Sequence, residues 1–264
     1  MSAVERLASE PLLRVTDLSR WYGSILGCRD VSFEMHPGEV LGIVGESGSG
    51  KTTLLKCLSG HLEPTSGKVE FDTRRHGMSD IYGLSEPDRR RMQREDWGFV
   101  HQNPRDGLRM RVSGGANVAE PLMSLGRRHY GEMRSATIDW LERVELDTSR
   151  IDDKPRNFSG GMQQRIQVAR NLIHGPKLVF MDEPTGGLDV SVQARLLDLL
   201  RELVRDLGLA VIIVTHDMAV ARLMADRLLV MRRGEVVETG LTDQVLDDPQ
   251  HAYTQLLVSS VLQI

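Results

Sequence analysis

The chain has 264 residues, of which 40% are hydrophobic and 27% are charged, and this balance is typical of a folded domain with a well-buried core. Its formal net charge of −4 does not favour nucleic acid as a partner. The apolar runs are much shorter than the ~20 residues that span a bilayer, residues 1–13 lack the apolar core of a signal peptide, and two cysteines are too few for a disulfide framework. We therefore expect a cytoplasmic protein without direct membrane insertion.

The first hundred residues predict strands and helices in alternation. "PLLRVTDL" (11–18) and "DVSFEMHPGEVLGIVG" (30–45) favour strands, the second interrupted by the turn residues "HPGE". "KTTLLKCLSGHLEP" (51–64) predicts a helix that its glycine and proline end. A variable stretch follows that contains a capped basic helix, "SEPDRRRMQRE" (85–95), and then the strand candidate "WGFVHQ" (97–102).

The second half of the chain predicts a helical insertion and then a return to alternation. Residues 103–158 show helical periodicity without a clear strand. Alternating strands and helices then lead to a C-terminal segment with one or two helices: "KLVFMDEP", "SVQARLLDLLRELVRDLG", "LAVIIVTHD", "MAVARLMAD", "RLLVMRRGEVVETG" and "TDQVLDDPQHAYTQLLVSSVLQI". This order predicts one α/β domain over residues 1–264 that carries a helical lobe.

A glycine-rich segment between a strand and a helix predicts a phosphate site. "GESGSGKTT" fits the pattern G-x-x-x-x-G-K-[ST], and the apolar strand before it supplies the required context. Backbone amides of such a loop wrap phosphates, the lysine adds a positive charge and the hydroxyl of Thr52 suits Mg²⁺. The candidate nucleotide-binding residues are Gly45, Glu46, Ser47, Gly48, Ser49, Gly50, Lys51, Thr52 and Thr53.

Two later strands end in polar residues that would lie at the same edge of the sheet. "LVFMDEP" ends in Asp182, suited to hold Mg²⁺ through water, and in Glu183, suited to orient or deprotonate an attacking water. "VIIVTHD" places His216 at the same edge, where it can contact the γ-phosphate. We expect Glu183, His216 and Lys51 to act in catalysis.

The order of the phosphate loop, "HQNP", "FSGGMQQR", "LVFMDEP", "GGLD" and "VTHD" resembles the ATP-binding subunits of ABC-type ATPases over essentially the whole chain. The resemblance implies an α/β P-loop NTPase fold with ATP and Mg²⁺ as cofactors. It implies a RecA-like core at about residues 1–102 and 175–264, an N-terminal antiparallel β part, and a helical lobe at about 103–174 that ends in the signature helix.

The same resemblance assigns roles to further residues. Tyr22 occupies the place of a ring that stacks on adenine, and Gln102 that of a catalytic glutamine that binds Mg²⁺ and senses the attacking water. Ser159, Gly160 and Gly161 would bind the ATP of a second subunit, which is either an identical chain or a paralogue. Gly186, Gly187 and Asp189 would form the dimer-contact loop, with added backbone freedom from the glycines.

Some positions depart from the commonest family pattern. Phe158 replaces a leucine and Met162 a glutamine in "LSGGQ", and "PTGGLD" stands where "PTSALD" is usual. "FSGGM" is similar to the oligopeptide and nickel importer branch, so the binding groups are expected to remain active. A second "SGG" at 113–115 lacks a following "QQR"-like segment and is predicted to be a turn.

The work that the ATPase drives is less determined. "DDPQHAYTQLL" resembles the oligopeptide importer branch, while "WGFVHQNPRDGLRMRVSGGANVAEPLM", "RRHYGEMRSAT" and "PTGGLDVSVQARLLDLL" resemble ATP-binding components of carbon–phosphorus lyase systems. The latter implies docking on the subunits of a lyase core in phosphonate catabolism. An importer ATPase for oligopeptides, nickel or phosphonates and a nucleotide-switched module with little turnover remain alternatives. An arginine-rich segment that includes Arg105, Arg109 and Arg111 is a candidate docking patch for an acidic partner.

Overall fold

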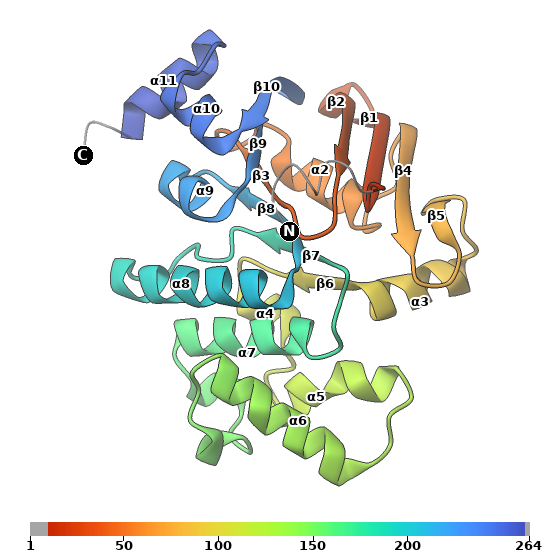
Figure 1. Cartoon of the computed structure of the whole chain (residues 1–264), viewed down its shortest axis with the longest axis vertical. Coiled ribbons are helices and arrows are strands. Elements are labelled where there is room, and N and C mark those ends of the chain that lie inside the picture. Colours follow the sequence, from red (N-terminus) through yellow and green to blue (C-terminus); the bar gives the residue numbers. More distant parts are fainter. Residues whose placement is uncertain (1–9, 262–264) are drawn as a thin grey trace.

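A computed structural model of the chain describes residues 10–261 and has a large sheet beside a smaller antiparallel one (Figure 1). The last three residues of the predicted C-terminal segment lie outside this range. The large sheet has the order β10 (Glu235–Leu241), β9 (Arg227–Arg232), β3 (Val40–Val44), β8 (Ala210–Thr215), β7 (Leu178–Asp182) and β6 (Trp97–Val100). All neighbours in this sheet are parallel except the β9–β10 hairpin. Five parallel strands therefore end at one edge.

The smaller sheet is antiparallel and covers the phosphate-loop side of the large one. Its order is β2 (Ile25–Met35), β1 (Leu13–Tyr22), β4 (Ser66–Thr73) and β5 (Gly77–Asp80). Strands β4 and β5 lie in the stretch that the sequence left as variable. β4 buries alternate residues, Val69, Phe71 and Thr73, as a half-buried strand does. The antiparallel part that the family resemblance implied is thus present.

The helices surround the large sheet and fill the segment between β6 and β7. Beside the core strands are α2 (Lys51–Leu58), α3 (Glu86–Asp96), α8 (Val190–Leu207), α9 (Met218–Met224), α10 (Thr242–Asp247) and α11 (Ala252–Val261). Residues 103–174 form α4 (Pro104–Gly107), α5 (Gly114–Ser124), α6 (Tyr130–Arg143), the 3-10 turns η1 (Thr148–Arg150) and η2 (Pro155–Asn157), and α7 (Gly160–Leu172), with no strand. None of the helices within residues 10–261 has the length and apolarity that crossing a membrane requires.

One sequence prediction in this segment is wrong. Ser113, Gly114 and Gly115 do not form a free turn, because Ser113 caps α5 and its hydroxyl accepts the amide of Ala116 at 3.3 Å. A serine at this position satisfies an amide that the helix leaves unpaired, whatever residues follow the glycines.

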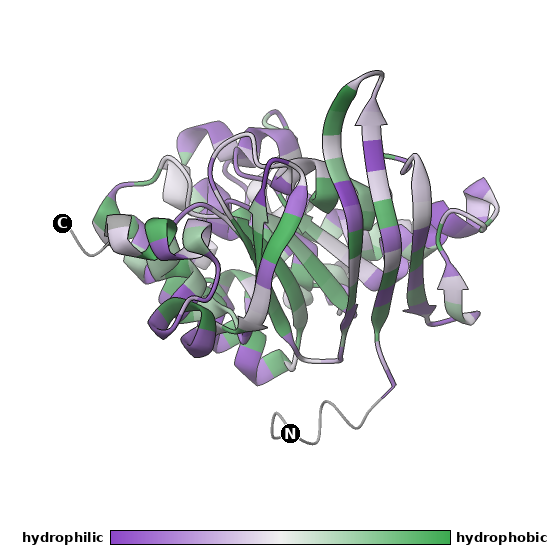
Figure 2. Cartoon of the chain, turned by 90° about the horizontal axis from the view of Figure 1, so that it is seen from above, coloured by the Kyte–Doolittle hydropathy of each residue, from purple (hydrophilic) through white to green (hydrophobic). Residues whose placement is uncertain are grey.

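Two hydrophobic clusters lie on the two faces of the large sheet, and Figure 2 shows its central strands as predominantly hydrophobic. Successive residues of a strand point to opposite faces. On β7, Val179 and Met181 therefore join the cluster under α7 and α8, while Leu178 and Phe180 join the cluster with α2 and the smaller sheet. Burial on both faces holds the strand ends in fixed positions.

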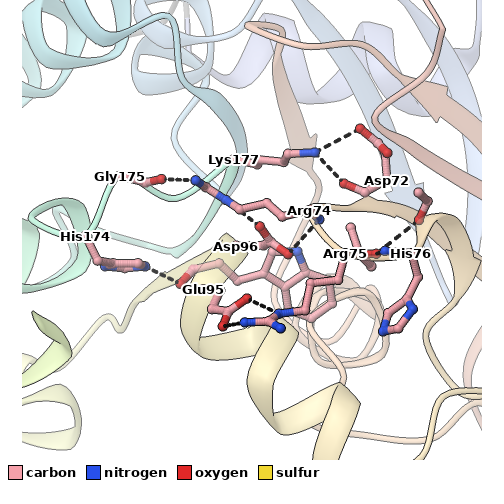
Figure 3. Close-up of polar contacts among 12 residues, drawn as sticks. Asp72, Arg74, Arg75, His76, Glu95, Asp96, His174, Gly175 and Lys177 are labelled. Carbon is pink, nitrogen blue, oxygen red and sulfur yellow. Dashed lines mark hydrogen bonds and ion pairs between the residues drawn. The ribbon is translucent and has the colours of Figure 1, made fainter. Parts of the chain in front are cut away.

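A polar network ties the smaller sheet to the end of α7, at the amino ends of β6 and β7 (Figure 3). The Arg74 guanidinium donates to the carboxylate of Asp96 at 2.7 Å and to the carbonyl oxygen of Gly175. Lys177 donates to the carboxylate of Asp72 at 2.9 Å. Asp96 is 1% exposed, and burial raises the pKa of its carboxyl although hydrogen bonds and charge from Arg74 oppose the shift. The network fixes the C-terminal end of α7, which is the predicted signature helix and begins with Gly160 and Gly161.

Candidate functional site

The phosphate loop joins β3 to α2 at the carboxyl edge of the large sheet. Gly45 and Gly50 adopt φ values of 148° and 103°, which favour glycine. A Cβ at Gly45 would lie 2.2 Å from the carbonyl oxygen of Met231, and one at Gly50 would lie 2.3 Å from that of Gly27. The glycines are thus required by both backbone conformation and space, as expected of a loop packed tightly against neighbouring backbone.

Lys51 closes this loop. Its Nζ donates to the carbonyl oxygens of Gly45 at 2.8 Å and Glu46 at 2.7 Å. Burial lowers the pKa of Lys51, while the carboxylates of Glu183, Asp182 and Glu46 oppose the shift. The buried cation has neutral oxygens as its hydrogen-bond partners, so an anion bound in the loop would add favourable charge.

Three predicted catalytic residues, Gln102, Glu183 and His216, meet beyond the ends of β6, β7 and β8. The Glu183 carboxylate accepts a hydrogen bond from Gln102 Nε2 at 3.0 Å, and its other oxygen lies 2.9 Å from His216 Nδ1. Glu183 has a φ of 43°, a conformation that costs about 1–3 kcal/mol for a residue with a side chain. Strain of this kind is common at functional sites. The side chains that the sequence placed at one edge are therefore in direct contact.

Asp182 lies beside this group and is half-buried. Burial raises the pKa of its carboxyl, the neighbouring Glu183 raises it further, and Lys56 and Lys51 oppose both effects. An added cation at this position would relieve both the burial and the repulsion. Thr52, the other predicted metal ligand on this side, is exposed in the first turn of α2. The donor set, carboxylate, hydroxyl and amide oxygens, suits Mg²⁺.

Tyr22 lies at the end of β1 and is 44% exposed. The Arg20 guanidinium carbon lies 4.9 Å from the centre of its ring. The ring and helix α2 both lie close to Gly27, because a Cβ there would be 3.0 Å from Tyr22 Cε2 and 2.7 Å from Thr53 Cγ2. An exposed ring beside the start of α2 can stack on a planar base.

The predicted signature residues begin α7 and lie apart from the phosphate loop. Ser159 is the N-cap, and its hydroxyl accepts the amide of Met162 at 3.4 Å. Gly161 is buried against α8, where a Cβ would lie 2.4 Å from Val192. Among residues 10–261, no hydrogen bond joins Ser159, Gly160 or Gly161 to the loop at 45–52. A single chain therefore does not combine the two sets.

The predicted dimer-contact loop lies between the two sets. A Cβ at Gly186 would be 2.9 Å from Gln102 Nε2, whereas Gly187, with a φ of 75°, has open space around it. Asp189 is exposed and makes no capping hydrogen bond at the start of α8. A surface cavity of about 520 Å³ is lined by Gln102, Gly160, Gly186, Gly187 and residues beside them.

One contact to the phosphate loop was missed by sequence reasoning. The hydroxyl of Tyr253, in α11, accepts the backbone amide of Glu46 at 3.0 Å. The segment "DDPQHAYTQLL" indicated a family resemblance and no contact to the phosphate loop. No local pattern links a tyrosine near the C-terminus to a loop that lies 207 residues earlier.

Comparisons with known proteins agree with this geometry. The sequence model of the ABC transporter family matches residues 28–186. The chain is 64% identical to the putative phosphonates utilization ATP-binding protein PhnK of Escherichia coli, over 97% of this chain and 99% of that one. It is 35% identical to the dipeptide transport ATP-binding protein DppF of Escherichia coli, over 98% of this chain and 79% of that protein.

Solved structures show the same fold. The chain matches cbiO1 of Clostridium perfringens, part of an ABC transporter complex, with a TM-score of 0.80 at 26% identity over 97% of this chain and 96% of that one. It matches the ATP-binding cassette MJ0796, a dimer bound to ADP and Pi in a post-hydrolysis state, with a TM-score of 0.76 at 29% identity over 87% and 98%. Together with the family match, these likenesses show that the chain belongs to the ABC transporter family and is an ATP-binding ATPase.

Proposed function

We propose that the chain hydrolyses Mg-ATP at the carboxyl edge of its large sheet, with Glu183 as the general base. The observation that supports this role is the carboxylate held between Gln102 and His216, at 3.0 and 2.9 Å. Two fixed hydrogen bonds orient the carboxylate toward a water that attacks the γ-phosphate. His216 also contacts the γ-phosphate in this scheme, and Gln102 links the water to the metal site.

The remaining residues bind and position the nucleotide. The amides of the loop at 45–52 cradle the phosphates, Lys51 exchanges its carbonyl partners for phosphate oxygens, and Tyr22 stacks on adenine. Thr52, Asp182 and Gln102 hold Mg²⁺, which neutralises charge on the phosphates when bound. Relief of the burial and repulsion at Asp182 favours the metal there.

We further propose that two chains, or this chain and a paralogue, close around each ATP. Within residues 10–261, Ser159, Gly160 and Gly161 make no hydrogen bond to their own loop, and Ser159 and Gly160 are exposed at the start of a helix, where amides favour anions. They would bind the γ-phosphate held by the partner. A Cβ at Gly187 would meet open space, and the Asp189 side chain makes no capping hydrogen bond to α8. Both features suit contacts between subunits.

A Glu183→Gln variant tests this scheme. The amide keeps the size of the side chain and removes the base, so we expect retained ATP, at least about 100-fold slower hydrolysis and accumulation of a closed dimer. Phosphate release and size-exclusion chromatography with ATP measure the two effects. Glu132→Gln, at an exposed position of α6, is the control. Hydrolysis at the wild-type rate in Glu183→Gln would remove Glu183 from the base role.

For the biological role, we propose that the ATPase acts in the cytoplasm with the carbon–phosphorus lyase core in phosphonate catabolism. The support is the 64% identity to PhnK, a protein whose name refers to phosphonate utilization. The 35% identity to DppF favours the second candidate, an importer ATPase. Tagged chain isolated from cells with a phosphonate as phosphorus source should carry soluble lyase subunits; recovery of an integral permease in their place would favour the importer.

Only some arginines of the candidate docking patch are suitable positions for a test of partner binding. Arg109 forms an ion pair with Glu120, which also pairs with Arg170, so reversing the charge of Arg109 would disturb a contact inside the chain. Arg105 and Arg111 are exposed. We expect Arg105→Glu with Arg111→Glu to weaken association with the lyase core and to spare nucleotide binding, and unchanged co-purification would exclude this surface.

A further inference from the structure

The C-terminal third of the chain makes hydrogen bonds and packing contacts to the phosphate loop. The residues that make them lie outside 28–186, the range that the family model matches. The Gly234 amide, in the β9–β10 turn, donates to the carbonyl oxygen of Ser49 at 2.9 Å. Met231 closes the space beside Gly45. The Tyr253 hydroxyl, from α11, accepts the Glu46 amide at 3.0 Å. The loop is therefore positioned by residues that no phosphate contacts.

Of these contacts, the one from Tyr253 holds the first corner of the loop. Glu46 directly follows Gly45, and its peptide groups are bonded on both sides. The Glu46 amide donates to Tyr253, while its carbonyl oxygen accepts from Lys51 at 2.7 Å and from the Ser49 amide at 3.2 Å. The amides that follow in the loop begin from this corner, so its orientation sets the direction in which they point.

Tyr253 is itself held firmly. It is 4% exposed, and the Arg232 guanidinium carbon lies 4.8 Å from the centre of its ring. The Glu238 carboxylate of β10 accepts the amides of Gln250 at 2.8 Å and His251 at 3.0 Å, which fixes the start of α11. A side chain that packs against β9, in a helix whose start is fixed by β10, can restrain the loop without moving itself.

From these contacts we infer that Tyr253 is a positioning residue that sets nucleotide affinity by holding the phosphate loop in its binding conformation. The inference rests on the proposed role of the loop at 45–52 in binding ATP. It assigns a function to the segment "DDPQHAYTQLL", which the reaction itself does not use. Tyr253 acts on phosphates through the Glu46 peptide and does not touch them.

The test compares Tyr253→Phe with Tyr82→Phe in the full-length chain. Tyr253→Phe keeps the buried ring and removes one hydrogen bond to the loop, so we expect the Kd for Mg-ADP and the KM for ATP to rise about fivefold. kcat should stay within about twofold, since the groups around Glu183 are unchanged. Adenosine, which lacks phosphates, should bind as it does to the wild type.

Tyr82 provides the matched control because its hydroxyl lies 2.6 Å from the carbonyl oxygens of Cys57 and Leu62, which share its one proton at the far end of α2. Tyr82→Phe should lower thermal stability and leave the Kd for Mg-ADP unchanged. An unchanged Kd in Tyr253→Phe, or an equal loss of affinity in both variants, would overturn the inference while the nucleotide site stands. A wild-type chain that binds no Mg-ADP would overturn both.

Discussion

Two Ser-Gly-Gly segments, 113–115 and 159–161, begin helices with the same local chemistry and have different surroundings. The serine of each caps its helix by accepting the amide three residues later, at 3.3 Å in α5 and 3.4 Å in α7. Each is followed by two glycines at the positive end of a helix dipole. Their local sequences alone do not show which one is available to a ligand.

The difference lies in what covers the glycine amides. Gly114 donates to the carbonyl oxygen of Asp153 at 2.7 Å and Gly115 to that of Ile151 at 2.8 Å, so the chain itself satisfies the start of α5. No acceptor for the amides of Gly160 and Gly161 is present among residues 10–261. The same motif is thus structural in one place and open in the other.

A negative charge introduced at each serine should produce the largest difference in ATP hydrolysis between the two segments. In the proposed dimer, Ser159→Glu would face the γ-phosphate of the partner's ATP, and we expect steady-state hydrolysis to fall about 100-fold or more through repulsion and loss of the hydroxyl. Ser113→Glu is the control, expected to keep hydrolysis within about threefold because its helix start is closed by Asp153 and Ile151. Equal losses in the two variants would contradict the proposed division of roles.

The two glycines of each segment should differ in the stability cost of an added methyl group. The second glycines are equally enclosed, since a Cβ would lie 2.4 Å from Ile151 Cγ1 at Gly115 and 2.4 Å from Val192 Cγ1 at Gly161, whereas a Cβ at Gly160, a first glycine, would meet only Leu188 Cδ2, at 3.6 Å. We expect Gly115→Ala to lower the free energy of unfolding by about 1–2 kcal/mol, after the helix propensity of alanine is counted. Gly160→Ala should be neutral or slightly stabilising in urea unfolding. A cost for Gly160→Ala as large as that for Gly115→Ala would show that the first glycine of a segment is enclosed as tightly as the second.

Removal of the caps should leave stability equal and activity unequal. Ser113→Ala and Ser159→Ala each delete one capping hydroxyl, and each should cost about 1 kcal/mol in urea unfolding. Only Ser159→Ala is expected to slow hydrolysis measurably when both variants are assayed at saturating ATP. A slower rate in Ser113→Ala as well would indicate that capping of α5 also supports catalysis.

The sequence predicted the parts of the site that a short continuous pattern or the end of a strand identifies. The loop at 45–52 could be recognised because its glycines, lysine and flanking strand form one continuous pattern. The meeting of Glu183 and His216 followed from where parallel strands end, whereas Gln102 was identified only by the family resemblance. Whether these residues and the tyrosine at position 22 act as proposed remains a prediction.

The rest was missed because its local signals were weak or misread, or because it depended on residues far apart in the chain. The helix start at Ser113 was misread because the prediction required a particular sequence after the glycines, although the serine cap alone begins α5. The strands β4 and β5 are short, and β5 (Gly77–Asp80) has no buried residue to reveal its period. Tyr253 reaches Glu46 from 207 residues away, and only the fold brings the two together.

The smallest expected effect concerns the other end of the signature helix, where Arg74 joins Gly175 to the buried Asp96. Burial raises the pKa of Asp96 above its ordinary value of 3.8, so the folded state binds the proton more tightly than the unfolded state. The contribution of this carboxyl to stability therefore falls as the pH rises from 3.8 through the folded-state pKa. The free energy of unfolding of the wild type minus that of Asp96→Asn should accordingly increase as the pH is lowered through this window, by less than about 1 kcal/mol. Urea unfolding across the acid range measures it, with Asp198→Asn on the exposed face of α8 as the control; a difference that shrinks on acidification would show that the ion pair with Arg74, rather than burial, governs this end of the helix.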